Sequence, residues 1–363
     1  MPQHLLLDIG PSVGGHGARG IGRYVRGLTD AIGQWSAERQ EIVWALSPTG
    51  DTPPLFAGRS VSASLLTIRP LDLGWILGSP AIGRAVKRAG ATVFHATDPH
   101  RPSRLRGVRQ IVTAYDLIPL HEPGMLDSWQ PHHRHAYRVY LDQLRHADAI
   151  VAISTTTADD VSEQLGIDPA RISIVYPVVQ APAAIERAPA AEPAFLFVGA
   201  LDSHKQPGLA VAALAEFRRV QGAGTLRFIG PSGPESRARL KHLAGVAGVA
   251  DQVAFLGRVS DGELDSEFAA ATALLCTSRI EGFGLPGVEA LLRGVPVIAV
   301  DTPAARETVG SAATLVESSA EAIAGAMAAP LPVADVTRQA LTERFSLQAT
   351  ADTLWAVYER SLG

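Results

Sequence analysis

The alternation of short β-rich apolar runs with amphipathic helical stretches constrains the fold of this 363-residue chain more than any other feature. Such alternation is typical of parallel sheets covered by helices. In the first half, the expected strands are residues 4–9, 41–46, 92–95, 110–114, 149–153 and 172–176. The expected helices are residues 21–33, 79–89, 130–145 and 155–165, and Ser154 is the expected N-cap of the last one.

The same pattern begins again after a proline-rich segment, residues 181–193, which is typical of a linker. The expected strands of the second half are residues 195–199, 226–230, 252–257, 273–277, 296–300 and 313–316. Its expected helices are residues 207–220, 234–246, 261–270 and 286–293, and a final amphipathic helix covers residues 346–360. We therefore expect an α/β protein with two Rossmann-like, doubly wound domains, residues 1–180 and 194–345, facing a cleft where ligands bind.

Composition excludes several other classes of protein. A formal net charge of −4 argues against a general nucleic-acid binder. A single cysteine, Cys276, excludes an internal disulfide and a cysteine-based metal cluster, and its apolar surroundings indicate a core residue. No apolar run approaches the ~18 residues of a spanning helix, and the start MPQHLLLDIG is typical of a first strand instead of a signal peptide. We expect a cytoplasmic enzyme.

The most specific motif is SRIEGFGLPGVEALLRGVPVIAV, residues 278–300. Glu281 and Glu289 flank a glycine-rich loop that continues through Pro286 into a short helix. Free backbone N–H groups and a helix N-terminus both favour a phosphate. The carboxylates are better suited to accept hydrogen bonds from hydroxyls. Phosphate and hydroxyls recognised together indicate a sugar nucleotide.

Two further motifs carry glycines or a cation near a strand end. In VGALDSHK, Lys205 follows the first strand of the second half and precedes a helix, where it suits a diphosphate. GHGARG, residues 15–20, matches the dinucleotide fingerprint GxGxxG, which would indicate an oxidoreductase. Four residues separate this motif from its strand, whereas a fingerprint opens the turn directly. The alternatives are a glycine loop that approaches a diphosphate and a surface loop without function.

The order of these motifs resembles the retaining glycosyltransferases of family four, which have the GT-B fold. The resemblance rests on a pair of glutamates separated by seven residues, and on the segments 20–28, 112–123, 152–161, 255–264 and 277–310. It covers nearly the whole chain and is closest to bacterial mannosyltransferase-like members. It implies that residues 1–180 form the acceptor-side domain and that the final helix, residues 346–363, crosses back onto it.

The resemblance also implies roles for individual residues. Glu289 is expected to hold the ribose, Glu281 the donor sugar, and Lys205 the diphosphate. The backbone of the loop is expected to contact sugar and phosphate through Gly282, Phe283, Gly284 and Leu285. Arg258 and Val259 fall where the family contacts the base. Gly17 and Gly20 are expected to approach the diphosphate when the domains close.

The sequence departs from the family at several positions. His204 stands where relatives often have an arginine, so the diphosphate would be held with less fixed charge. The family's cleft histidines are replaced by Thr97 and Tyr115, and a substitute is expected among Thr97, Asp98, Tyr115 and Asp116. His95 is expected to be a buried residue with satisfied hydrogen bonds.

Two clusters suggest other partners. The basic residues Arg84, Lys87, Arg88, Arg101, Arg104, Arg106 and Arg109 would attract an anionic acceptor or a membrane surface, or else form a solvated face. HHRH, residues 132–135, resembles a metal site, but consecutive helical residues point in different directions. No metal and no cofactor are expected.

The sequence therefore predicts a metal-independent hexosyltransferase that uses a GDP- or UDP-linked sugar and retains the anomeric configuration. The acceptor would be a hydroxyl of a glycan, a glycolipid or a secondary metabolite. Two alternatives stay open. One is a sugar-nucleotide epimerase of the same fold, and the other is a nucleotide-binding but inactive partner of another transferase.

Overall fold

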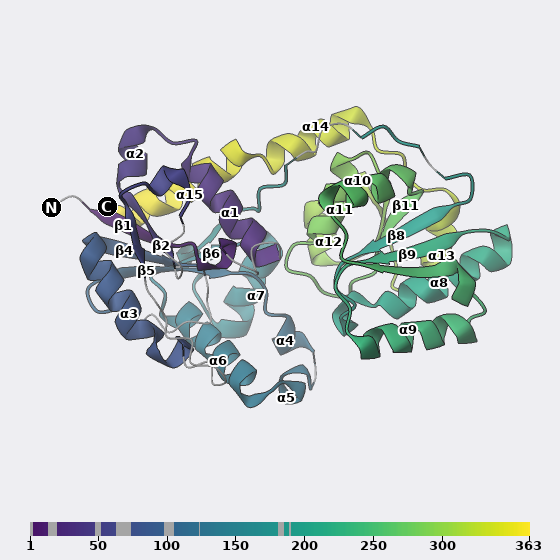
Figure 1. Ribbon diagram of the computed structural model, residues 1–363, viewed down its shortest axis with the longest axis horizontal. Helices are drawn as coiled ribbons and strands as arrows, with labels where there is room; N and C mark the ends of the chain where they lie inside the picture. The colour runs from purple at the N-terminus through teal and green to yellow at the C-terminus, as the bar shows by residue number, and fades with distance from the viewer. Residues whose placement is uncertain are drawn as a thin grey trace. The chain divides into compact units, whose positions relative to one another are not determined.

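The computed structural model describes residues 3–13, 20–47, 52–62, 74–97, 105–122, 124–180, 185–188 and 190–363. The chain divides into two compact units, of which the first comprises Met1–Val178 and Phe345–Gly363 and the second Val179–Arg344. Each unit contains a parallel sheet covered by helices (Figure 1). The expected fold class, with two Rossmann-like sheets, is confirmed.

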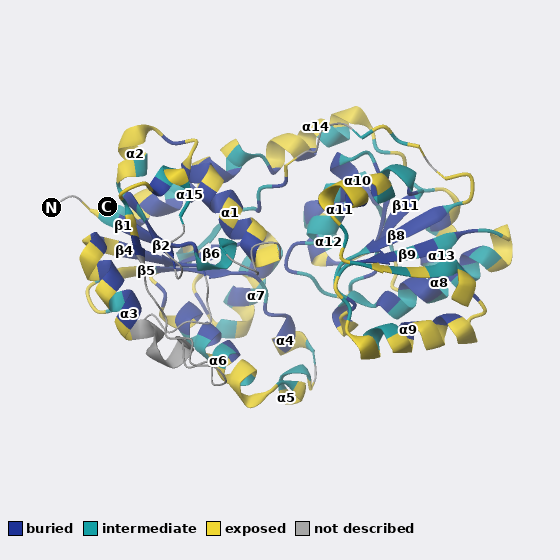
Figure 2. Ribbon diagram, in the orientation of Figure 1, coloured by how far each residue is buried: buried dark blue, intermediate teal, exposed yellow. Residues whose placement is uncertain are grey.

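The described part of the first unit forms a seven-stranded sheet in the order β3-β2-β1-β4-β5-β6-β7. Its strands are β1 (His4–Asp8), β2 (Val43–Ser47), β3 (Ser60–Ser62), β4 (Ala91–Ala96), β5 (Arg109–Ala114), β6 (Ala149–Ala152) and β7 (Ile172–Ile174). All neighbouring strands pair in parallel. The central strands are apolar and almost wholly buried (Figure 2), as expected for a sheet covered on both faces.

Helices cover both faces of this sheet. On one face lie α3 (Gly74–Ala89), α6 (Pro131–His146) and α7 (Thr155–Leu165), whose apolar side chains form one core with the strands. On the other face lie α1 (Gly20–Ile32) and α15 (Leu347–Leu362) (Figure 1). The short helices are α2 (Ala37–Glu41), α4 (Ile118–His121) and α5 (Met125–Ser128). Ser154 is the N-cap of α7 and accepts from the Thr157 N–H, as expected.

Helix α15 contributes polar partners to the core of the first unit, although it lies at the other end of the chain. The Tyr358 hydroxyl is 2.7 Å from His95 Nδ1, and Thr113 Oγ1 is 2.9 Å from His95 Nε2. Trp35 Nε1 donates to the Ala351 carbonyl of α15 at 3.4 Å. His95 is fully buried with both ring nitrogens partnered, as the sequence predicted.

The burial of His95 makes stability depend on pH. Burial lowers the pKa of His95 to about 3, below its ordinary value of 6.5. Above pH ~6.5 the imidazole is neutral in both the folded and the unfolded state. Between pH ~6.5 and the folded pKa only the unfolded state binds the proton, so the free energy of unfolding falls by up to ~1.4 kcal/mol for each unit that the pH drops.

We therefore expect the His95→Gln variant, which cannot titrate, to lose this contribution. Urea denaturation from pH 7 to pH 5 should give a smaller decline in the free energy of unfolding for His95→Gln than for the wild type. The variant itself is expected to be less stable at pH 7, because glutamine cannot reproduce both hydrogen bonds. Equal pH slopes in the two proteins would show that His95 does not control the acid dependence.

The described part of the second unit forms a six-stranded parallel sheet in the order β10-β9-β8-β11-β12-β13. Its strands are β8 (Ala194–Val198), β9 (Thr225–Ile229), β10 (Val253–Gly257), β11 (Ala273–Cys276), β12 (Val297–Val300) and β13 (Thr314–Val316). One face is covered by α8 (Pro207–Gln221), α9 (Pro234–Val246) and α13 (Ala320–Ala328). The remaining helices are α10 (Asp261–Ala270), α11 (Leu285–Leu292), α12 (Pro303–Thr308) and α14 (Asp335–Arg344).

The expected linker, residues 181–193, lies partly outside the described residues. In its described part, the N–H groups of Ala188 and Ala190 donate to the carbonyls of Ala269 and Ala270 at 3.1 Å. This part of the segment is therefore held against the second unit by main-chain hydrogen bonds.

Candidate active site

The loop between β11 and α11 contains the motif that the sequence singled out. Gly284 caps α11 in the left-handed region, with φ of 86°, where most side chains would be strained. Gly287 lies in the first turn, and a Cβ there would stand 3.1 Å from Val309 Cγ1. The two glycines therefore allow the sharp entry into α11 and its close packing, which direct the helix N-terminus towards the carboxyl end of β11.

Lys205 and Glu281 meet at this end of the sheet. Lys205 Nζ forms an ion pair with Glu281 Oε1, and Ser278 Oγ donates to the same oxygen at 2.7 Å. The Lys205 and Glu281 side chains are only 18% and 20% exposed, so water screens the pair less than a surface pair. This places one cation and one anion side by side near the N-terminus of α11.

The main chain around Lys205 is tied to the loop after β11. Thr277 Oγ1 donates to the carbonyls of Lys205 at 2.7 Å and Gln206 at 3.0 Å. The Arg279 N–H donates to the His204 carbonyl at 2.8 Å. Gln206 has φ of 47°, and among the described residues it is the sole non-glycine at positive φ. These bonds fix the turn that carries Lys205 against the turn that carries Glu281.

A pocket opens beside the ion pair. Four predicted donor residues line it, namely Lys205, Glu281, Phe283 and Gly284. Cys276 also lines the pocket and is half-buried, so it is not simply the core residue that the sequence suggested. Desolvation and the neighbouring Glu281 carboxylate raise the pKa of the Cys276 thiol to about 12, so it stays protonated at neutral pH.

Three further predicted donor residues belong to the loop and helix that border this pocket, although they do not line it. Gly282 is buried in the loop, Leu285 begins α11, and Glu289 follows one helical turn later with its side chain half-buried. Arg258 and Val259 follow β10 and precede the Ser260 N-cap of α10.

His204 is 7% exposed, and its Nδ1 is buried without a hydrogen-bond partner among the described residues. The His204 imidazole is therefore buried beneath the turn, and Lys205 is the basic residue of this turn that lines the pocket.

In the first unit, Thr97 and Tyr115 contact each other at the carboxyl ends of β4 and β5. The Tyr115 hydroxyl donates to the Thr97 carbonyl at 2.8 Å, and Thr97 Oγ1 donates to the Asp8 carbonyl at 2.5 Å. The Tyr115 ring packs edge-on against Tyr24, with 5.6 Å between the centroids. Thr97 is fully buried and Tyr115 is 7% exposed, so this geometry suits them to hold the carboxyl ends of the two strands together.

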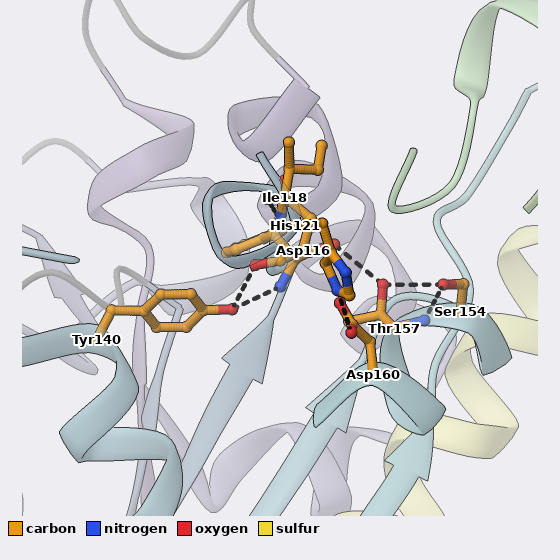
Figure 3. A network of polar contacts seen from close by, with 8 residues as sticks. Asp116, Ile118, His121, Tyr140, Ser154, Thr157 and Asp160 are labelled. Carbon is orange, nitrogen blue, oxygen red and sulfur yellow. Dashed lines mark hydrogen bonds and ion pairs between the residues drawn. The ribbon is translucent and has the colours of Figure 1, made fainter. Parts of the chain in front are cut away.

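Asp116 belongs to a polar network at the ends of β5 and β6 (Figure 3). Its Oδ1 accepts from the Ile118 N–H at 3.2 Å, and its carbonyl accepts from the Tyr140 hydroxyl at 3.3 Å. Asp116 itself is only partly buried. Asp116 is therefore the part of this site, next to Thr97 and Tyr115, that a ligand can reach.

Figure 3 also shows a second pair in this network, His121 and Asp160, whose Nε2 and Oδ1 atoms are 2.5 Å apart. Thr157 Oγ1 donates to the Tyr115 carbonyl at 3.1 Å. The sequence did not indicate His121 or Asp160, since they lie 39 residues apart and meet only through the fold.

The glycines predicted at the N-terminal loop are described in part. Gly17 lies outside the described residues, and so do Arg101, Arg104 and Asp98. Gly20 is the first residue of α1 and is exposed, with open space where a Cβ would stand.

Comparison with known families identifies the fold and the two halves of the chain. A model described as "Glycosyltransferase Family 4" matches residues 18–181, and one described as "Glycosyl transferases group 1" matches residues 182–332. The chain belongs to the family-4 glycosyltransferases. The recognition made from the sequence motifs is thus confirmed.

Two relatives and one solved structure are similar to this glycosyltransferase. The D-inositol 3-phosphate glycosyltransferase of Gordonia bronchialis is 31% identical over 60% of this chain and 53% of its own. The O-antigen chain mannosyltransferase RfbU of Salmonella typhimurium is 26% identical over 72% of this chain and 71% of its own. The structure of Anabaena HepE with UDP and glucose superposes with a TM-score of 0.70 at 16% identity, covering 99% of this chain and 100% of that one.

The match to HepE shows that this glycosyltransferase has the GT-B fold. The chain spans about half the length of the first curated relatives that it matches. No helix in the described part of the glycosyltransferase has the length and apolar character needed to cross a membrane. Within the same described ranges, no group of three or more His, Cys, Asp or Glu side chains is placed to hold a metal ion.

Proposed function

We propose that the protein transfers a hexose from a nucleoside-diphosphate sugar to an acceptor hydroxyl, with retention at the anomeric carbon. The observation that carries this proposal is the cluster of Lys205, Glu281 and Ser278 at the N-terminus of α11. A cation and a helix N-terminus suit a diphosphate, while a carboxylate suits sugar hydroxyls. The structure of HepE with UDP and glucose supports a nucleotide-sugar donor, and we expect a UDP- or GDP-linked one.

In this proposal, Lys205 releases Glu281 when the donor binds. The ammonium group then neutralises the leaving diphosphate, whose negative charge grows in the transition state. Glu281 becomes free to accept hydrogen bonds from the sugar, and Ser278 keeps its carboxylate oriented. Glu289 would accept from the ribose, Arg258 and Val259 would contact the base, and the loop N–H groups of residues 282–285 would bind the phosphates.

The acceptor would bind to the first unit, at the carboxyl ends of its strands, where Asp116 lies. Thr97 and Tyr115 would position the start of the loop after β5, which carries Asp116, through their mutual contact. The acceptor hydroxyl would attack from the face that the diphosphate leaves, and a phosphate oxygen would take its proton. This scheme requires no metal ion, because Lys205 and the helix N-terminus supply the positive charge. It requires no protein side chain as a base, because the phosphate oxygen accepts the proton.

A donor screen followed by product analysis tests this proposal. Among UDP-, GDP-, ADP- and dTDP-linked hexoses, the true donor is expected to raise Tm most, because it binds the folded state most tightly. With that donor and a sugar acceptor, NMR of the product should show an anomeric configuration equal to that of the donor. Release of an altered sugar nucleotide without acceptor would instead show an isomerase, and binding without any turnover would show an inactive partner protein.

A further inference from the structure

A cavity of about 360 Å³ lies at the amino-terminal ends of the strands of the first sheet, whereas Asp116 lies at their carboxyl ends. It is formed where β5, β6 and β7 begin, and the last turn of α15 closes it. We call it the arginine pocket, and its lining residues are Arg109, Asp148, Ala149, Ala170, Arg171, Ser173, Val357, Arg360 and Ser361. The family comparison and the proposed transfer reaction assign no role to this place.

Each of the three arginines is anchored through one guanidinium nitrogen. Arg109 Nη1 donates to the carbonyls of Arg360 at 3.1 Å and Ser361 at 2.9 Å, which complete the C-terminus of α15. Arg171 Nη2 donates to the carbonyls of residues 145 and 147. Arg360 Nη2 donates to Ser173 Oγ at 2.8 Å. These bonds hold the guanidinium groups in place and leave their other N–H donors available to a ligand.

The charge of the arginine pocket is not balanced by its carboxylate. Asp148 is the one acidic residue in the lining, and its Oδ2 accepts from the Gln110 N–H at 2.7 Å. Among the described residues, no carboxylate lies within ion-pair distance of Arg109, Arg171 or Arg360. Three guanidinium charges against one carboxylate give the pocket a net charge of about +2.

We propose that the arginine pocket binds a phosphate group, as a free anion or as part of a larger phosphate ester. Anchored guanidinium forks match the oxygens of a phosphate and bind it through charge-assisted hydrogen bonds. The volume of the cavity exceeds what a single phosphate needs, so an attached organic group also fits. Ser173 and Ser361 at the wall offer neutral hydrogen-bonding groups to that remainder.

This phosphate site is separate from the carboxyl ends of the strands, where Asp116 lies. Arg109 begins β5, and Asp116 follows its end, so the two residues are roughly 20 Å apart along an extended strand. The arginine pocket also contains no residue of the Lys205 and Glu281 cluster. Occupation of the pocket is therefore a binding event of its own and not a part of donor recognition.

Thermal unfolding of the full chain in sodium phosphate and in sodium chloride of equal ionic strength tests the proposal. Phosphate is expected to raise the Tm of the wild type progressively with concentration. The Lys205→Met variant should keep this rise, which excludes phosphate bound at the donor site. Arg360→Gln and Arg171→Gln should each weaken the apparent affinity for phosphate about tenfold or more, because each removes a charge-assisted contact.

Arg88→Gln on α3 is the matched control, since it removes an exposed arginine outside the pocket and should leave the rise in Tm intact. Sedimentation with phosphatidylcholine vesicles, with and without phosphatidic acid, distinguishes the source of the phosphate. Binding only to phosphatidic acid vesicles, lost in Arg360→Gln, would identify a lipid headgroup. Equal phosphate effects in the wild type and in both pocket variants, or no response of the wild type to either probe, would overturn the proposal.

Discussion

Replacement of Lys205 by methionine is expected to lower kcat by about two to three orders of magnitude, the usual effect of removing one group that stabilises developing charge. In the proposed reaction, the ammonium group is the nearest side-chain cation to the leaving diphosphate. The negative charge on that diphosphate is greater in the transition state than in the bound donor. The fall in kcat should therefore exceed the rise in KM for the donor.

Lys205→Arg and Lys241→Met are informative controls for this prediction. Lys205→Arg keeps the charge but not the compact ammonium geometry, and it should recover only part of the activity. Lys241 is exposed on α9, so Lys241→Met should retain full activity. Steady-state kinetics with the preferred donor provides both constants. A Lys205→Met variant with unchanged kcat would exclude Lys205 from charge stabilisation.

Replacement of Glu281 by alanine is expected to reduce kcat by about a hundredfold or more while changing stability by no more than ~1–2 kcal/mol. The carboxylate is partly exposed, and its contacts are the Lys205 ammonium and the Ser278 hydroxyl. Its loss therefore leaves no cavity in the core. Its loss also removes the acceptor that would hold the sugar hydroxyls, so turnover should suffer far more than folding.

Urea denaturation and donor kinetics on the same preparations separate these two effects. Glu281→Gln retains the shape of the side chain but not its charge, and it should recover little activity if the charge is needed. Glu235→Ala removes an exposed carboxylate at the start of α9 and should behave as the wild type. Full activity in Glu281→Ala would show that the donor sugar is held by other residues.

The fold was largely predictable because parallel strands are continuous apolar runs. Every strand expected from such a run is present, and the helix expected at residues 261–270 coincides with α10. Strand β3 was missed because it has three residues, two of them serines. Helix α14 was missed as well, because its ten residues include a single buried one, Leu341, and so show no apolar stripe.

The candidate site was predictable in its residues but not in their contacts. Glycine and proline spacing identified the loop before α11, because positive φ and the helix start have local sequence signals. The ion pair between Lys205 and Glu281 has no such signal, since it joins turns that are 76 residues apart. Likewise, the substitution of cleft histidines at Thr97 and Tyr115 was visible, but their hydrogen bond to each other depends on how β4 and β5 align.

The hydrogen bond between His95 and Tyr358 joins residues that are 263 positions apart. A ribosome makes His95 and most of the first sheet early, but it makes α15 only after the whole second unit. Until then, the face that α15 covers is open, and the His95 ring lacks its tyrosine partner. The first unit can therefore complete its core only after the second unit has been synthesised, and a nascent chain must keep this apolar face from other contacts throughout that interval.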